Sequence, residues 1–153
     1  MKKILVVGLI LTTQIFVGCG ENSAEKNPPP KKVEKVFDLS KAKDGTYTAE
    51  SSRDEKLGKS ILTLTIRDKK ITDAKFSGYD LFGNEKGEDY GSLTGKDSAD
   101  YKKAQVAVKA IKNYPAQLLE TQDLYKVDAI SGASISYGQF VETAEKILTD
   151  ATE

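Results

Sequence analysis

The sequence predicts an α+β fold, a small antiparallel sheet packed with helices. Residues 60–66 alternate apolar and hydroxyl side chains as a half-buried strand does, and a charged turn at 67–70 leads into a second strand at 71–77. Strands joined by so short a turn pair antiparallel. Apolar residues then return at helical spacing in two longer stretches, 98–113 and 136–148, which are enough to cover one face of a small sheet.

The first eighteen residues have the composition of an export signal. Two lysines follow the initial methionine, and residues 4–17 form an apolar run that only Thr12, Thr13 and Gln14 interrupt. The run is too short for a comfortable membrane span, and it matches a secretory signal peptide. We therefore expect residues 1–18 to be a signal peptide.

Cys19 is the one cysteine of the chain and directly follows Gly18. The segment Phe16-Val17-Gly18-Cys19 resembles the lipobox of bacterial lipoproteins, which implies cleavage after Gly18 and diacylglyceryl transfer to Cys19. Two acyl chains anchor a protein stably where one does not. The resemblance therefore implies a lipid-anchored protein on the extracytoplasmic face of the cell membrane. The alternative is a secreted protein whose cysteine lies at the cleavage site by chance.

Residues 19–35 are polar and charged after Cys19, contain the run Pro28-Pro29-Pro30 and show no apolar period. We expect this segment to be a disordered tether, stiff at its prolines. The remaining residues, 36–153, have the length of a single domain.

Charge and composition exclude several function classes. Lysine and arginine together number 23, as do aspartate and glutamate, so we expect no nucleic-acid partner. Histidine is absent, which excludes Ser-His-Asp triads, Cys-His pairs and zinc sites built from histidine and cysteine. The carboxylates do not have the spacing of a calcium loop, so we expect no metal site. Redox chemistry would require a bound cofactor.

The first strand of the domain is expected at Thr46–Ser51, before the pair already described. A long irregular loop should follow the third strand from Tyr79 to Gly95, because glycine, aspartate, asparagine and glutamate dominate it. Long ordered loops often carry function, so this one is either a wall of a cofactor site or a plain surface excursion. Lys86 in this loop could reach an anionic group, although a lysine on a loop is usually solvated.

A helix is expected over residues 98–113, with Ser98 as its N-cap. Tyr114-Pro115 should end this helix, because proline disfavours helical backbone in the residue before it. Pro115 would then open a shorter helix through Leu119. Four residues should form the apolar stripe of the helix over residues 98–113: Tyr101, Ala104, Val108 and Ile111.

The most informative stretch is a junction near the C-terminus. Residues 127–130 suggest a short strand, residues 132–134 a turn of small side chains, and Ser136 with Gln139 the capping box of a following helix. A glycine turn that leads into a helix N-terminus can receive an anion such as phosphate, with the Ser134 hydroxyl at its edge. The alternative is a capped helix without a ligand.

The motif Asp128-x-x-Ser131-Gly132-Ala133-Ser134 resembles the flavinylation motif of the FMN-binding domain family. Its members include covalently flavinylated subunits of sodium-pumping NADH:quinone reductase and of Rnf-type ferredoxin oxidoreductases, and flavin-carrying surface lipoproteins. In that family a flavin transferase joins FMN, through its phosphate, to the hydroxyl of the last motif residue, usually threonine. Serine at this position keeps the hydroxyl.

Five further stretches of this chain resemble landmarks of the family: 44–47, 66–76, 86–90, 114–118 and 137–140. The resemblance therefore covers about residues 38–150. It implies a set of cofactor-binding residues in which Ser134 forms the FMN phosphoester: Asp128, Ser131, Gly132, Ala133, Ser134, Ile135 and Ser136. Asp128 would shape the turn or be recognised by the transferase. Five aromatic residues either flank the flavin ring or belong to the core: Tyr79, Phe82, Tyr90, Tyr114 and Tyr137.

The function implied is that of a membrane-anchored flavoprotein with covalently bound FMN that transfers electrons from membrane donors to extracytoplasmic acceptors. The donor would be a membrane quinol or an NADH dehydrogenase-type system, and a flavin transferase would be a second partner. With no room for a reductase domain, the chain would be a redox carrier rather than a stand-alone enzyme. Two alternatives remain: a lipoprotein that binds FMN or another small ligand without a covalent bond, and a structural lipoprotein.

Overall fold

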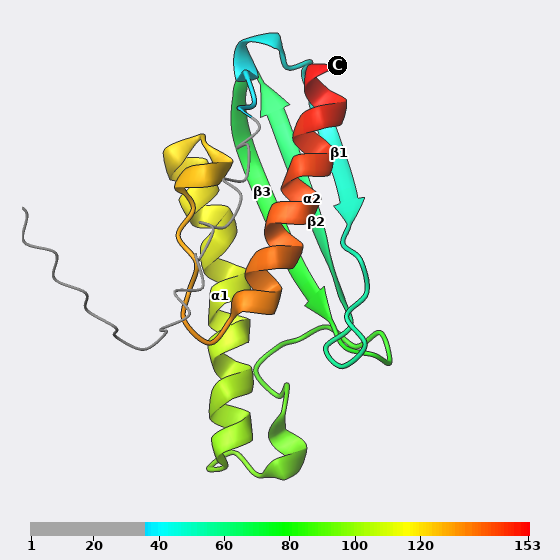
Figure 1. Ribbon diagram of the computed structural model, residues 1–153, viewed down its shortest axis with the longest axis vertical. Helices are drawn as coiled ribbons and strands as arrows, with labels where there is room; N and C mark the ends of the chain where they lie inside the picture. The colour runs from blue at the N-terminus through cyan, green and yellow to red at the C-terminus, as the bar shows by residue number, and fades with distance from the viewer. Residues whose placement is uncertain (1–35) are drawn as a thin grey trace, which may run out of the picture. The chain divides into compact units, whose positions relative to one another are not determined.

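The computed structural model describes residues 36–153, and the expected signal peptide, Cys19 and tether lie outside this range. Three antiparallel strands form one sheet in the order β1 (Gly45–Glu50), β2 (Lys59–Arg67) and β3 (Lys70–Tyr79). Two helices, α1 (Ala99–Thr121) and α2 (Ser134–Thr152), lie over one face of this sheet, α1 against β3 and α2 against β1 and β2 (Figure 1). The predicted α+β fold is confirmed.

The central strand β2 explains why only one face of the sheet is covered. Leu62, Leu64 and Ile66 are fully buried beneath the helices. The hydroxyls on the opposite face hydrogen-bond across to β1, Thr63 to Thr48 at 2.9 Å and Thr65 to Thr46 at 3.1 Å. Period-two alternation therefore separates an apolar face from a hydroxyl face.

Strands β2 and β3 are joined by the predicted tight turn. Arg67 pairs with Lys70, and the two residues between them, Asp68 and Lys69, have φ of 50° and 63°. Two residues with positive φ form a hairpin turn whose twist suits the flanking strands. The 3₁₀ turns of the described residues are η1 (Leu39–Lys41), η2 (Ser92–Thr94) and η3 (Leu124–Lys126).

Helix α1 begins as predicted but does not end at Pro115. The Ser98 hydroxyl caps it by accepting a hydrogen bond from the Tyr101 N–H at 3.0 Å. The prediction of two shorter helices is wrong, because one helix continues to Thr121 with Pro115 inside it. A proline within a helix costs about 3 kcal/mol. Here buried residues on both sides of it, among them Tyr114 and Leu118, hold the helix against the core.

The core is shared by both helices and the sheet. The predicted apolar face of α2 is confirmed, since Phe140, Ala144, Ile147 and Leu148 are buried. Phe140 contacts Phe76 of β3 edge to face, with ring centroids 5.1 Å apart, and Tyr114 of α1 at 5.5 Å. One aromatic cluster therefore ties α1, α2 and β3 together.

The junction before α2 differs from the prediction in two ways. Residues 127–130 form no strand, and α2 begins at Ser134 with Ala133 as its N-cap rather than at Ser136. Gln139 does not take part in a capping box. Its side chain is buried, accepts a hydrogen bond from Ser60 Oγ at 2.7 Å and donates one to Gly58 O at 2.9 Å. The hydrogen bonds to Ser60 Oγ and Gly58 O therefore fix the position of the Gln139 side chain.

Replacing Gln139 by leucine is expected to lower the free energy of unfolding by about 1–3 kcal/mol. The substitution leaves the buried Ser60 Oγ without its acceptor, which costs about 1–3 kcal/mol, whereas Gly58 O keeps the hydrogen bond from the Asp54 N–H at 2.7 Å. Urea unfolding measures this as a lower midpoint at constant slope. Asp150→Leu puts the same side chain on an exposed position of α2 and should change stability by less than about 0.5 kcal/mol. Equal midpoints for the two variants would contradict the role of the amide.

Candidate functional site

The candidate motif lies in the connection between η3 and α2. Its backbone is held from behind by side chains of both helices: the Tyr137 hydroxyl donates to Val127 O at 3.1 Å, and Gln117 Oε1 accepts from the Asp128 N–H at 2.8 Å. The Asp128 side chain is exposed. The connection is therefore a supported loop, and its carboxylate faces outward.

Gly132 has a conformation that other residues rarely adopt. Its φ is +83°, and the turn around it is closed by the Ala133 N–H, which donates to Ile130 O at 3.0 Å. A Cβ atom at this position would lie 3.3 Å from Val106 Cγ1 of α1. Left-handed backbone and close approach to α1 both favour glycine here. The loop consequently passes close to the middle of α1.

The first turn of α2 presents hydrogen-bond donors without acceptors. Among residues 36–153 no acceptor is found for the N–H groups of Ser134, Ile135 and Ser136, and no side chain caps the helix. The first N–H to enter the helical pattern is that of Tyr137, which donates to Ala133 O at 2.9 Å. Open N–H groups at the positive end of the helix dipole suit the oxygens of a phosphate.

The hydroxyls of this turn have different surroundings. Ser134 is exposed, as are Ser131, Gly132 and Ile135, whereas Ala133 is buried. Ser136 is only 5% exposed, and its hydroxyl has no hydrogen bond within the described part of the chain. The motif therefore offers one accessible hydroxyl on the first turn, that of Ser134, and a second, recessed one. This donor set fits a phosphate ester of FMN.

Two of the five aromatic candidates support the loop from the inside. Tyr114 is 0% exposed, and its hydroxyl is 3.4 Å from both Ala133 O and the Ile130 nitrogen. Tyr137 packs on Tyr114, with ring centroids 5.6 Å apart. For Tyr114 the structure thus favours the core alternative over a place beside a flavin ring.

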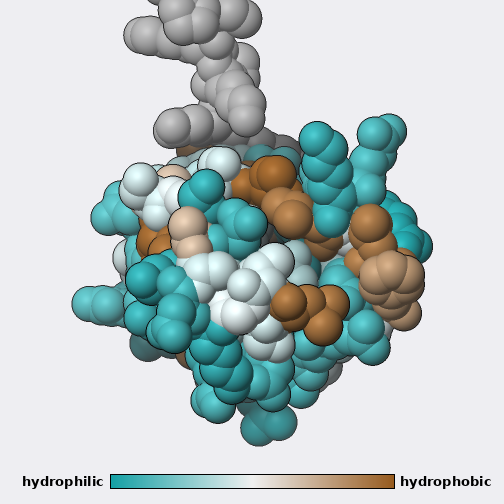
Figure 2. Space-filling model, turned by 90° about the horizontal axis from the view of Figure 1, so that it is seen from below, coloured by the Kyte–Doolittle hydropathy of each residue, from teal (hydrophilic) through white to brown (hydrophobic). Residues whose placement is uncertain are grey.

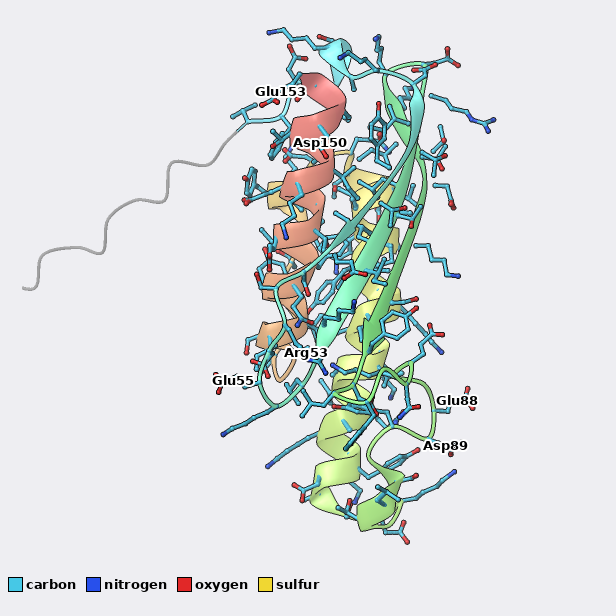
Figure 3. The ribbon with its side chains drawn as sticks, turned by 90° about the vertical axis from the view of Figure 1, so that its right-hand side faces the viewer. Arg53, Glu55, Glu88, Asp89, Asp150 and Glu153 are labelled. Atoms are coloured by element: carbon cyan, nitrogen blue, oxygen red, sulfur yellow. The ribbon has the colours of Figure 1, made fainter. Side chains whose placement is uncertain are left out.

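The segment between β1 and β2 borders the beginning of α2. Ser52 donates two hydrogen bonds to Glu142 Oε1, from its N–H and its hydroxyl, each 2.8 Å long. Asp54 closes a turn by accepting from the N–H groups of Lys56 and Leu57. In Figure 3 the labelled Arg53 and Glu55 lie toward the end of α2 opposite Asp150 and Glu153. This segment is therefore tied to α2 through Glu142 and Gln139.

The loop after β3 is ordered against the N-terminal half of α1. The Gln105 side chain donates to Glu88 O at 3.1 Å and to Tyr90 O at 3.0 Å, and the Tyr101 hydroxyl donates to Glu88 O at 2.8 Å. Figure 3 places the labelled Glu88 and Asp89 beside that half of the helix. The long loop of the prediction therefore has a defined position.

Four large apolar residues of the loop after β3 and of the start of α2 are exposed: Leu81, Phe82, Leu93 and Ile135. Phe82 is 90% exposed. Figure 2, which views the molecule from below, shows separate apolar groups among hydrophilic side chains. The face seen there consequently carries dispersed apolar groups and no continuous apolar patch.

Lys86, for which the sequence left open a contact with an anionic group or a solvated position, is buried in the structure. Only 6% of it is exposed, and its Nζ lies 5.4 Å from the centroid of the Tyr90 ring. Burial lowers the pKa of Lys86, and the carboxylates of Asp54 and Asp80 act against this lowering. Of the two alternatives, the fully solvated lysine is wrong, and no contact with an anionic group is tested. Its neighbours in the sequence are polar, so no local pattern separates it from a surface lysine.

Residues 36–153 contain no group of histidine, cysteine, aspartate and glutamate placed to hold a metal ion. Within the same range no helix combines the length and the apolar character needed to cross a membrane.

Comparison with known proteins gives one family. The family model described as "FMN-binding domain" matches residues 57–149, a range that runs from the start of β2 through the motif into α2. The crystal structure of a protein from Clostridium perfringens has a TM-score of 0.57 and 29% identity over 72% of this chain and 88% of that one. A solution NMR structure of a protein from Clostridium thermocellum has a TM-score of 0.45 and 25% identity over 72% and 93%. No curated protein matches the chain.

Proposed function

Because this chain belongs to the FMN-binding domain family, with FMN as its cofactor, we propose that it carries electrons on an FMN joined to Ser134 by a phosphoester bond. One observation carries the proposal. The exposed Ser134 hydroxyl lies on the first turn of α2, beside three N–H groups without an acceptor in the described range and next to Gly132 at positive φ. A hydroxyl acceptor and donors for the remaining phosphate oxygens are thereby in one place.

Attachment at Ser134 is a phosphoryl transfer. The bond that forms joins Ser134 Oγ to the FMN phosphorus, and the hydroxyl proton leaves to a base. The bond that breaks is a phosphoanhydride, so the donor is an activated FMN such as a flavin dinucleotide, with AMP as leaving group. Neither histidine nor a second cysteine is present in the chain to activate the hydroxyl. A separate flavin transferase therefore supplies that chemistry, with the exposed Asp128 and Ser131 available for its recognition.

Once bound, FMN supplies the redox chemistry of the protein, since the side chains contain no redox-active pair. The donor we propose is a membrane quinol or an NADH dehydrogenase-type system. A quinol would give two electrons, release two protons and leave as quinone. The electrons, with protons from water where the acceptor needs them, would go on to an extracytoplasmic acceptor, so the protein would be a carrier between two partners.

We further propose that the protein is held on the extracytoplasmic face of the cell membrane by a diacylglyceryl group on Cys19. The place of Cys19, directly after Gly18 at the end of an apolar run, supports this assignment. Residue 36 is followed by η1, and the Lys43 N–H donates to Ala151 O at 2.8 Å, near the last turn of α2. Ser134 begins the same 19-residue helix, roughly 27 Å away at 1.5 Å per residue. A flavin on Ser134 would thus be presented away from the point where the tether joins the domain.

The test is the mass of the denatured protein after export together with a flavin transferase and a supply of flavin. The proposal expects a gain of one FMN minus one water, with the yellow colour retained on denaturation. Colour that is lost on denaturation would instead identify a non-covalent FMN binder. A colourless protein under these conditions would overturn the flavin-carrier function.

A further inference from the structure

We propose that the free edge of β1, together with the side of α2 next to it, binds an extended segment of a partner protein that carries lysine or arginine. The segment would add to the sheet as a fourth strand. This inference does not depend on the attachment of FMN at Ser134, because other residues carry it.

Strand β1 forms one edge of the sheet, and within residues 36–153 no strand pairs with its outer side (Figure 1). In an antiparallel pair, residues that bond the neighbouring strand alternate with residues whose backbone groups point away from it. The Ser51 N–H donates to Ser60 O at 2.9 Å, so the odd-numbered residues of β1 bond β2. The backbone groups of Thr46 and Thr48 therefore point outward from the sheet.

The contact that covers part of this edge lies at one end of β1. Lys146 Nζ of α2 donates to Glu50 O at 2.8 Å, which agrees with the outward direction of the even-numbered residues. In the described range no partner is found for the N–H and C=O groups of Thr46 and Thr48. An exposed edge strand is a template for pairing with another chain. Two donors and two acceptors are therefore available to an added strand.

A groove of about 610 Å³ lies between this edge and α2. Figure 3 looks onto this side of the molecule and labels Asp150 near the end of the helix. On the strand side the groove is lined by Ala49, whose small side chain leaves room next to the edge. Alternate side chains of a strand point to opposite faces of its sheet. Every second side chain of a strand added to β1 would therefore enter the groove.

The charge of the groove indicates which side chains suit it. Four carboxylates line it beside a single lysine, Lys146, which pairs with Glu142 at 2.8 Å. Glu50 has an ion pair with a lysine of β2. Glu145 and Asp150 have no ion pair within residues 36–153. Complementary charge guides the choice of partner at an interface, so cationic side chains are expected on the face of the segment that meets α2.

A second copy of this chain suits the edge less well than a basic segment. Two β1 strands paired antiparallel about a two-fold axis would bring both α2 helices to the same face of the joined sheet. The carboxylates of Glu142, Glu145 and Asp150 would then face those of the other copy. Like charges set against one another disfavour such an interface. The charge of α2 thus favours a partner over self-association.

The experiment titrates the full-length protein with a seven-residue peptide of alternating lysine and threonine. Its lysines would meet Glu145 and Asp150, and its threonines would continue the hydroxyl face of the sheet. Amide NMR measures the affinity and the hydrogen exchange of single N–H groups. Near saturation we expect exchange at Thr46 and Thr48 to slow by about tenfold or more. Exchange at Tyr47, whose N–H bonds β2, should not change.

Two controls separate backbone pairing from the attraction of charges. The same peptide with every backbone nitrogen methylated keeps its lysines but has no backbone donors, and it should bind weaker by about tenfold or more. The double variant Glu145→Lys/Asp150→Lys should bind the unmodified peptide about tenfold more weakly. Asp97→Lys/Glu120→Lys changes the net charge equally at two exposed acids away from β1 and should keep the wild-type affinity.

Four results would overturn the inference. The first is absence of binding, and the second is binding without slower exchange at Thr46 and Thr48. The third is equal affinity of the two double variants. The fourth is slow exchange at these two N–H groups in the protein alone, because a second copy or another segment of the chain would then occupy the edge.

Glu145 also accepts a hydrogen bond from the Tyr125 hydroxyl at 2.9 Å, so its replacement affects more than charge. If the double variant does not fold, Asp150→Lys is compared with Glu120→Lys by the same criterion. Ser134→Ala should bind the peptide with wild-type affinity. Failure of FMN attachment and failure of peptide binding are therefore separate results.

Discussion

Replacing Ser134 by alanine is expected to abolish covalent attachment of FMN while leaving the fold intact. The substitution removes the one exposed hydroxyl on the first turn of α2. The Ser134 side chain has no hydrogen bond within the described residues, so the free energy of unfolding should change by less than about 0.5 kcal/mol. Intact mass after denaturation measures the first effect, and urea unfolding the second.

Two matched variants make the assignment specific. Ser134→Thr keeps a hydroxyl at the same atom position and should carry FMN. Ser136→Ala removes the recessed hydroxyl of the same turn, 5% exposed in the structure, and should also carry FMN. If Ser136→Ala lost the FMN mass and Ser134→Ala retained it, the attachment site would be Ser136.

The sheet could be predicted from the sequence because its signals are local. Alternation along Leu62, Leu64 and Ile66 fixes which face of β2 is buried, and a charged four-residue turn leaves no other pairing for β3. The strands found differ from the predicted ones by one or two residues at their ends. Such ends depend on pairing with a neighbour, which the pattern of one strand does not contain.

The errors around the helices have a common cause, which is tertiary packing that overrides a local rule. Pro115 stays inside α1 because its neighbours are buried on the core side. Gln139 has the spacing of a capping residue, yet it serves Ser60 and Gly58, which are about 80 positions earlier in the chain. No local pattern reports such distant partners.

The candidate site also has a part that could be predicted from local sequence and a part that depends on tertiary packing. The motif from Asp128 to Ser134 is contiguous, so its small residues and its place before a helix could be identified directly. Lys86 becomes buried only through the folding of a long loop onto α1. Composition suggested a solvated lysine there, and burial became visible only with the structure.

Replacing Tyr114 by alanine is expected to be the most destabilising change in the domain core, with a loss of about 3–5 kcal/mol. Its ring is fully buried against Phe140 and Tyr137. Removal would leave a cavity where both helices meet, and because domains are only marginally stable, much of the protein would unfold at moderate urea concentrations. The unfolding midpoint in urea measures this loss.

Tyr114→Phe keeps the packing of the ring and removes the hydroxyl, so it measures the contribution of the hydroxyl alone. That hydroxyl lies 3.4 Å from both Ala133 O and the Ile130 nitrogen, immediately before Ser134. We expect phenylalanine to cost only about 0.5–1.5 kcal/mol and to lower the flavinylated fraction of the folded protein, because the loop before α2 would lose a support. Wild-type stability and wild-type attachment in Tyr114→Phe would mean that Gln117 and Tyr137 hold this loop without help from the hydroxyl. The core position of Tyr114 would then matter for folding alone, and the geometry of the attachment site would depend on the two remaining contacts.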